Sequence, residues 1–310
     1  MQVFRGIEQS RELLSTPVLT LGNFDGIHRG HQALVQEVLG RARAGGHPAA
    51  AMTFDPHPVS VVAPHKAPPL ITTLEERIEQ LEGLGLAALI VQPFDLDFAA
   101  LEPERFASDV LFDGVRPAEL VVGFNYGFGK GRSGGVDVLT AAGQERGIPV
   151  SVLPPVLTDD GIRVSSTGVR ERVAAGDLAG AANLLGRPFE ITGRVERGAE
   201  RGSKLGFPTA NLLPGGRLLP PPGVYATRVR IGERTGLPAA THVGQPPSFD
   251  GPVAVEAHIL DFSEELRGQR IGVSFIERVR ESRPFDSLEA LTAQIARDVL
   301  SVRERLARRP

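Results

Sequence analysis

Two histidines, His28 and His31, are well placed to do chemistry, because they lie three positions apart within the stretch GNFDGIHRGH. An apolar run over residues 17–21 predicts a buried strand before them, and the apolar-periodic residues 32–43 predict a helix that ends at Gly45 and Gly46. A strand, a glycine-rich loop and a helix present backbone N–H groups and a positive helix end to an anion. Two imidazoles at that place can donate hydrogen bonds to a phosphate as charge develops on it. The plainer alternative is a turn that carries two surface histidines.

The stretch VSSTGVR is a second candidate for phosphate binding. Ser165, Ser166 and Thr167 offer hydroxyl and N–H groups, and Arg170 offers a planar fork that fits a phosphate. The alternative is an ordinary helix cap followed by a solvated arginine. We expect this segment to meet the two histidines at one sheet edge and to form the second wall of a single phosphate site.

The loop before the histidines holds further candidates. Asp25 is a hard oxygen ligand that could hold Mg²⁺, and it could equally be an aspartate that stabilises a turn. The neighbouring residues that we expect at the phosphate site are Gly22, Asn23 and Phe24.

Two other motifs suit a flat heterocyclic ligand. TFDPHP places the rigidly held Pro56 and His57 directly after a predicted strand. The stretch GFNYGFGKGR supplies aromatic faces from Phe124, Tyr126 and Phe128, and it supplies the amide of Asn125. An aromatic-stiffened loop without a ligand is the alternative for this second stretch.

The C-terminal half carries its own candidates. Thr209 and Asn211 in LGFPTAN lie on one face of an extended chain, where a hydroxyl and an amide oxygen could complete a Mg²⁺ site with phosphate oxygens and water. Glu256 in VEAHILDF alternates with apolar residues, so a strand would hold its carboxylate in place to take a proton from a hydroxyl. A polar turn and a solvent-facing glutamate are the plainer alternatives. The remaining residues expected at phosphate groups here are Gly198, Gly202, Lys204 and Gly206.

The elements that must position these groups follow two patterns along the chain, first alternating strands and helices and then consecutive strands. Strands are predicted at 49–54, 87–92, 119–123 and 149–153, and helices at 103–112, at 136–145 and after a capping box at Thr73. This alternation indicates a Rossmann-like α/β domain with a parallel sheet covered on both faces, in which ligands bind beyond the carboxyl ends of the strands.

The rhythm changes after two short predicted helices, 167–175 and 178–185, the second of which is capped by Asp177. Strand-like segments then follow one another without helices, which favours an antiparallel sheet or small β-barrel; a terminal helix, capped by Asp286, closes the chain. We therefore predict two domains, residues 1–186 and 187–310. The five predicted strands are 189–197, 223–231, 237–243, 253–261 and 270–279.

Composition excludes several classes of protein. The 310 residues contain no cysteine, so disulfides, thiolate metal sites and a cysteine nucleophile are excluded. A net charge of −3 gives no reason to expect a nucleic-acid partner. The sequence predicts neither a membrane span nor a signal peptide, so we expect a cytoplasmic protein. Weak homo-oligomerisation stays open.

Taken together, the motifs resemble those of the prokaryotic bifunctional riboflavin kinase/FAD synthetase family over nearly the full chain. GNFDGIHRGH and VSSTGVR are similar to the two signatures of nucleotidylyltransferases, and TFDPHP and GFNYGFGKGR are similar to the FMN adenylyltransferase branch. LGFPTAN, PPGVYA, VEAHILDF and FDSLEALTAQIARD are similar to the riboflavin kinase module.

The resemblance implies two reactions and their site residues. The C-terminal barrel would phosphorylate riboflavin to FMN with ATP, with Thr209 and Asn211 holding Mg²⁺ and Glu256 acting as base. The N-terminal domain would adenylylate FMN to FAD and release pyrophosphate, with the histidines and the VSSTGVR segment stabilising the reacting phosphates. Asn125 and its aromatic neighbours would hold the flavin. Riboflavin, FMN, FAD and ATP would be substrates and products, not permanent prosthetic groups.

The sequence departs from the family pattern at several kinase positions. HVGQPPSF replaces a segment of the type Asn-Ile-Gly-x-Arg-Pro-Thr-Phe, which puts Pro246 at the arginine position and Ser248 at the threonine position. Arg267 stands where a tyrosine is usual, and Ser282 where an acidic residue is usual. Two alternatives therefore stay open: an adenylyltransferase with a weak or inactive kinase module, and a flavin-binding regulator.

Overall fold

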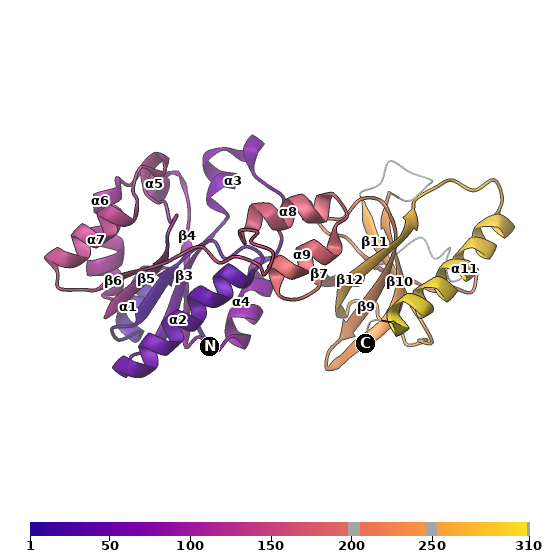
Figure 1. Cartoon of the computed structure of the whole chain (residues 1–310), viewed down its shortest axis with the longest axis horizontal. Helices are drawn as coiled ribbons and strands as arrows, with labels where there is room; N and C mark the ends of the chain where they lie inside the picture. The colour runs from indigo at the N-terminus through magenta and orange to yellow at the C-terminus, as the bar shows by residue number, and fades with distance from the viewer. Residues whose placement is uncertain (198–204, 246–252, 309–310) are drawn as a thin grey trace. The chain divides into compact units, whose positions relative to one another are not determined.

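The computed structural model describes residues 1–197, 205–245 and 253–308, and the chain divides into two compact units, Met1–Ser166 and Thr167–Pro310 (Figure 1). Helix α9 (Leu178–Leu185) packs against strands β7 (Phe189–Arg194) and β12 (Arg270–Glu281), which explains its place in the second unit. The predicted domain boundary between residues 186 and 187 stays a prediction.

The first unit is built on a six-stranded parallel sheet with the order β1-β4-β3-β2-β5-β6. Its strands are β1 (Gln2–Arg5), β2 (Val18–Leu21), β3 (Ala49–Asp55), β4 (Ala88–Pro93), β5 (Glu119–Gly123) and β6 (Val150–Leu153). Its helices are α1 (Ile7–Leu13), α2 (Arg29–Gly45), α3 (Pro58–Val62), α4 (Leu74–Gly83), α5 (Leu96–Ala99), α6 (Pro103–Arg105) and α7 (Val136–Glu145), with a π-helical segment (Phe106–Val115) and short 3₁₀ turns (Pro64–Lys66 and Lys130–Arg132).

Both faces of this sheet are buried, as the sequence predicts. Leu19 and Leu21 of β2 belong to a core that also contains Phe106 and Leu139, from the π-helical segment and α7. Val18 belongs to the opposite core, which includes residues of α2 and α4. Strands buried on both faces become continuous apolar runs, and this is the pattern that predicts them.

Local signals fix several helix ends. Helix α2 ends at Gly46, whose φ of 68° is the left-handed conformation that glycine adopts readily. The capping box of Thr73 and Glu76 begins α4, as predicted. Helix α9 begins at its predicted cap, Asp177.

The second unit is an antiparallel sheet with the order β7-β12-β9-β10-β11-β8 and a long C-terminal helix. The sheet curls so far that its two ends meet, because Glu196, just beyond β7, bridges to Asn211 of β8. This geometry confirms the predicted barrel-like architecture. The elements not bounded above are α8 (Ser166–Ala174), β8 (Ala210–Leu212), β9 (Gly223–Ile231), β10 (Arg234–Gly244), β11 (Ala254–Ile259) and α11 (Leu288–Ala307).

Helix α11 covers one side of the curled sheet. Its Val302 and Leu306 are buried against Ala226 and Leu260. Asp298, which is 5% exposed, accepts hydrogen bonds of 2.8–3.0 Å from the guanidinium of Arg280 in β12. A buried carboxylate needs such pairing, so this contact fixes the helix on the sheet.

Four elements differ from the prediction. The N-terminal residues form strand β1 before α1, and β8 adds a short strand to the second sheet. The N-cap of α11 is Ser287 and not Asp286, because the Ser287 hydroxyl accepts the hydrogen bond from Ala290 N at 3.1 Å. The predicted helix 103–112 is real, but most of it is the π-helical segment.

Candidate functional site

The loop after β2 lies where the sheet order reverses. The chain leaves β2 toward β3 on one side, and β5 pairs with β2 on the other side. In open parallel sheets this reversal creates a crevice beyond the carboxyl ends of the two central strands. The loops that follow β2 and β5 are GNFDGIHRGH and FNYGFGKGR, so both predicted motifs lie at this edge.

The backbone of the β2 loop is held in an uncommon conformation. Phe24 and Ile27 have φ values of 49° and 40°, and Gly26 has a φ of 89°. A Cβ atom at Gly26 would lie 3.0 Å from the side chain of Ile71, so another residue there would crowd Ile71 as well as strain the backbone. Left-handed non-glycine residues persist only where surrounding contacts fix them, and such residues are frequent at ligand sites.

Two buried charged residues supply those contacts. The Asp25 carboxylate accepts hydrogen bonds from the N–H groups of Ile71 and Thr72 at 3.1 and 2.9 Å, and from the Thr72 hydroxyl at 3.1 Å. Arg77 donates to the carbonyl of Asn23 at 3.0 Å. Burial lowers the pKa of Arg77, and the nearby Asp25, Asp55 and Glu76 oppose that shift. These contacts are those of an aspartate that stabilises a turn, and the role of Asp25 in holding Mg²⁺ stays a prediction.

The two histidines stack on each other with ring centroids 3.7 Å apart and an interplanar angle of 12°. His28 is the N-cap of α2, and its Nδ1 accepts a hydrogen bond from the N–H of His31 at 3.3 Å. An accepting Nδ1 carries no proton, so the neutral His28 ring is protonated at Nε2 and can donate from there. Local capping thus fixes the tautomer of a predicted phosphate ligand.

The predicted second wall of the phosphate site begins next to this loop. Ser166 donates its hydroxyl hydrogen bond to the carbonyl of Asp25 at 2.9 Å, and Ser165 is half-buried. Thr167 is exposed and Arg170 is half-buried on α8, within the second unit. That Thr167 and Arg170 converge with the histidines on one phosphate stays a prediction.

Of the residues expected at a planar ligand, His57 lies nearest to the loop. Its Nε2 is 3.3 Å from the amide nitrogen of Asn23, and its Nδ1 accepts from the N–H of Val59 as the cap of α3. Pro56 is exposed before it. The arrangement fixes the imidazole at the carboxyl end of β3.

The aromatic loop after β5 corrects one expectation. Phe128 is only 6% exposed, because its backbone pairs with Gly134 and its ring packs against Phe106 at a centroid distance of 5.1 Å. It is a core residue, and burial likewise raises the pKa of Tyr126. Of the four loop residues expected at the flavin, Phe124 and Asn125 are exposed, and Phe124 is 40% exposed.

The second unit assembles its own polar cluster on neighbouring strands. Asn211 of β8 pairs in register with Glu256 of β11, which pairs with His242 of β10. Apolar neighbours of Glu256, such as Val255 and Ala257, are buried, whereas Glu256 is half-buried, as its alternation predicts. The amide nitrogen of Asn211 donates to the carbonyl of Thr209 at 3.1 Å, which leaves the amide oxygen available as a ligand.

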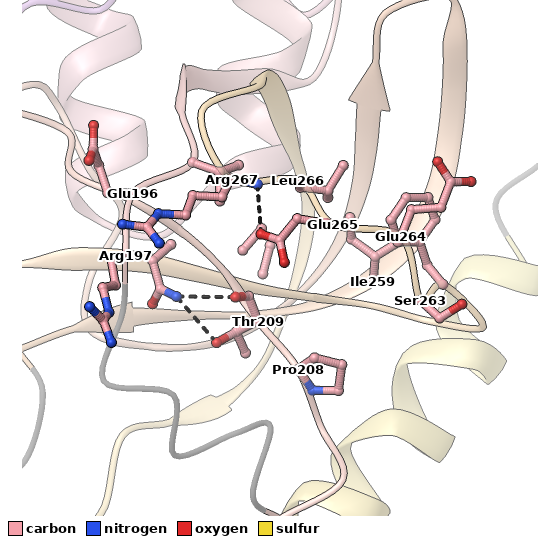
Figure 2. Close-up of a pocket in the computed structure, with 15 residues that line it drawn as sticks. Glu196, Arg197, Pro208, Thr209, Ile259, Ser263, Glu264, Glu265, Leu266 and Arg267 are labelled. Carbon is pink, nitrogen blue, oxygen red and sulfur yellow. Dashed lines mark hydrogen bonds between the residues drawn. The ribbon is translucent and has the colours of Figure 1, made fainter.

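Asn211 of this cluster also lines a cavity of about 370 Å³ (Figure 2). The other polar lining residues include Thr209, the cationic Arg197 and Arg267, and the carboxylates Glu196, Glu264 and Glu265. Hydroxyl and amide oxygens suit a hard cation, and guanidinium groups suit phosphates. The cavity can therefore hold an anionic ligand together with its metal ion.

Several predicted positions cannot be placed. Gly198, Gly202, Lys204, Pro246 and Ser248 lie outside the described residues. Gly206 is described, and it is exposed with a φ of 85°.

Sequence reasoning missed Arg77 and His242. Arg77 directly follows the capping box of α4, which gives no sign of its role; its 2% exposure and its hydrogen bond to Asn23 show that it supports the loop. The signal for His242 was the alternation of polar and apolar residues, because His242 precedes the apolar Val243 in the predicted strand 237–243. The next predicted strand contains Glu256.

Comparison with known proteins relates both units to enzymes. The FAD synthetase family model matches residues 10–168, and the riboflavin kinase family model matches residues 185–306. A bifunctional riboflavin kinase/FMN adenylyltransferase from Escherichia coli (strain K12) is 40% identical over 307 residues, which covers 98% of this chain and 97% of the relative. The protein of the same description from Bacillus subtilis (strain 168) is 34% identical and covers 93% and 92%.

A solved structure shares the whole fold. It is described as a macrolide-efflux protein from Streptococcus pneumoniae, and it superposes with a TM-score of 0.82 at 28% identity, covering 98% of this chain and 99% of the other. Within the described ranges of the present chain, no helix is long and apolar enough to cross a bilayer.

Proposed function

Because the chain belongs to the bifunctional riboflavin kinase/FMN adenylyltransferase family, we propose that it phosphorylates riboflavin with ATP and then adenylylates the resulting FMN to FAD. One observation carries the proposal. The two family models divide the chain in the same order as the two polar clusters, one at the carboxyl edge of the parallel sheet and one on the curled sheet.

For adenylylation, an oxygen of the FMN phosphate attacks the α-phosphorus of ATP and pyrophosphate leaves. A phosphate dianion is already a nucleophile, so this step needs donors for developing negative charge more than it needs a base. His28 Nε2–H, His31 and the hydroxyl of Ser165, all within the first unit, supply such donors. Phe124 and Asn125 are the exposed groups that would contact the flavin ring.

For phosphorylation, the riboflavin 5′-hydroxyl attacks the γ-phosphorus of ATP. Glu256 takes the hydroxyl proton. The cavity that Asn211, its cross-strand neighbour, lines takes the nucleotide, with Arg197 and Arg267 as cations for the phosphates. Positioning and charge neutralisation dominate phosphoryl transfer, so few groups are required.

We propose Mg²⁺ as the metal of the kinase site. Thr209 and Asn211 fit it, because their oxygens are hard donors and Mg²⁺ keeps several water and phosphate ligands of its own. The bound ion would neutralise charge on the ATP phosphates. Since both steps consume ATP, we propose the cytoplasm as the compartment.

Chromatographic separation of flavins tests the proposal. The purified protein is incubated with riboflavin, ATP and Mg²⁺, and separately with FMN, ATP and Mg²⁺. FMN followed by FAD in the first reaction is expected. FAD formed only from FMN would establish an adenylyltransferase with an inactive kinase unit, and no product in either reaction together with tight FMN binding would establish a flavin-binding regulator.

A further inference from the structure

His242 is the third member of a row of side chains that crosses three strands. It lies opposite Glu256, and Glu256 lies opposite Asn211. Residues directly opposite each other in an antiparallel pair share one face and have Cβ atoms about 4.5–5.5 Å apart. All three are half-buried, although the sequence neighbours Val243 and Val255 are buried. His242 therefore lies on the same face of the sheet as Glu256 and Asn211, the two residues predicted for the kinase site.

Both nitrogens of the His242 ring have partners. Nδ1 is 3.5 Å from the Oε2 atom of Glu256, and Nε2 is 2.8 Å from the hydroxyl oxygen of Ser282, just beyond β12. The first contact is an ion-pair distance and the second is a hydrogen bond. With the proton of the neutral ring on Nδ1, the positive edge of the ring lies near the carboxylate, while Nε2 accepts the Ser282 hydroxyl proton. Two partners on opposite sides of the ring leave it little rotational freedom.

We propose that His242 is a positioning residue, which Ser282 holds in place and which orients the Glu256 carboxylate toward the acceptor hydroxyl. This inference rests on the proposed kinase activity. In the reaction, the hydroxyl oxygen forms a bond to the γ-phosphorus as the bond from that phosphorus to the bridging oxygen breaks. The hydroxyl proton passes to Glu256, and ADP leaves with the bridging oxygen.

The pair also accounts for two departures from the family pattern. Position 242 holds histidine where the pattern has asparagine, and position 282 holds serine where the pattern has an acidic residue. In the structure these two side chains contact each other directly. Histidine is longer than the asparagine of the pattern, and serine is shorter than the acidic residue of the pattern. The two departures therefore form one contact.

Kinetics of FMN formation by the full chain test the role of His242. His242→Ala removes both contacts, and we expect kcat to fall by up to about 10²-fold with little change in KM, because the carboxylate is misplaced and the substrates still bind. His242→Asn keeps an N–H donor near the place of Nδ1 and should recover much of kcat. Ser282→Ala should lower kcat less than His242→Ala does.

Three controls separate this role from a merely structural one. His65→Ala changes an exposed histidine of the other unit, and kcat for FMN formation should stay unchanged. The His242 and Ser282 variants and the control should all convert FMN to FAD at the wild-type rate. They should also unfold at the wild-type temperature. Equal kcat values for active wild-type protein and His242→Ala would overturn the inference alone, as would failure of His242→Asn to exceed His242→Ala. No FMN from wild-type protein would overturn the kinase proposal as well.

Discussion

His28 combines a structural and a chemical task on one ring, and substitution can separate them. Its Nδ1 caps α2, while Nε2 carries the proton that we assign to phosphate binding. His28→Asn keeps an acceptor for the N–H of His31, so thermal stability should stay near that of wild type. FAD formation should fall about 10²- to 10³-fold, because a transition-state donor is lost. His28→Ala should lose the same activity and about 1 kcal/mol of stability.

Rates of FAD formation from FMN and thermal unfolding of the same preparations check this prediction. FMN formation from riboflavin serves as the control, because His28 belongs to the other unit. A His28→Asn variant with wild-type adenylylation would remove His28 from the phosphate site.

Asp25 should matter for stability more than for metal binding. Its carboxylate accepts three hydrogen bonds in a buried position, and removing one partner of a buried hydrogen bond costs about 1–3 kcal/mol. Asp25→Ala should therefore shift the urea midpoint of the N-terminal unit downward in the absence of nucleotide. Far-UV circular dichroism is the measurement, since the chain has no tryptophan. Unchanged stability with a raised Mg²⁺ requirement would favour the metal role instead.

For single residues, the sequence predicts which chemical groups a motif supplies, but it does not predict which of their side chains are exposed. Phe124 and Phe128 have the same chemistry and lie in the same motif, but only Phe124 is exposed. The difference comes from the bridge between Phe128 and Gly134, which turns the ring into the core. That bridge depends on tertiary contacts, so the residue types in the motif do not predict it.

Among the elements, helix α9 offers a test of a predicted cap. Asp177 accepts a hydrogen bond from the N–H of Gly180 at 2.8 Å and pairs with Arg172. The hydrogen bond from Gly180 contributes most to lowering the pKa of Asp177, with Arg172 adding to it and burial opposing it. Asp177→Ala should cost about 1 kcal/mol at neutral pH.

The pH dependence of that cost has a definite sign. A carboxyl group whose pKa is lower in the folded state contributes stability above its unfolded pKa, about 3.9 for aspartate, and loses it as the pH falls further. Unfolding of wild type and Asp177→Ala should therefore differ at pH 7 and converge below about pH 4. A difference that persists in acid would mean that the helix-capping charge is not its cause.

Elements with strong local signals are predictable from the sequence, and elements that depend on a partner are not. The apolar run of β2 and the capping box of α4 each specify their structure locally. Strand β1 is short and lies at the sheet edge, where pairing with β4 makes it a strand. Strand β8 exists because three of its residues pair with β11.

For the whole molecule, separate hydrophobic cores in the two units imply two activities that can be inactivated separately. The first unit has a core on each face of the parallel sheet. The second unit buries apolar residues of its strands, such as Tyr225 and Phe275, and a further cluster between the curled sheet and α11. The order of motifs along the sequence is enough to predict this division into an α/β part and a barrel part. The spacing of motifs contains no information on how the flavin product of one site reaches the other.

The transfer of FMN between the two sites can be measured by mixing two variants, each of which lacks one of the two activities. Glu256→Gln should abolish FMN formation, with a loss of about 10²- to 10⁴-fold for a general base, and should retain FAD formation from FMN. His28→Asn should show the opposite pattern. Neither variant alone should then convert riboflavin to FAD, whereas an equimolar mixture should do so, because FMN released by one chain can enter the other. Dilution of the mixture should slow FAD formation more steeply than FMN formation, since the second site must capture free FMN. If both variants keep their single activities and the mixture still makes no FAD, the chain that makes FMN does not release it to solution.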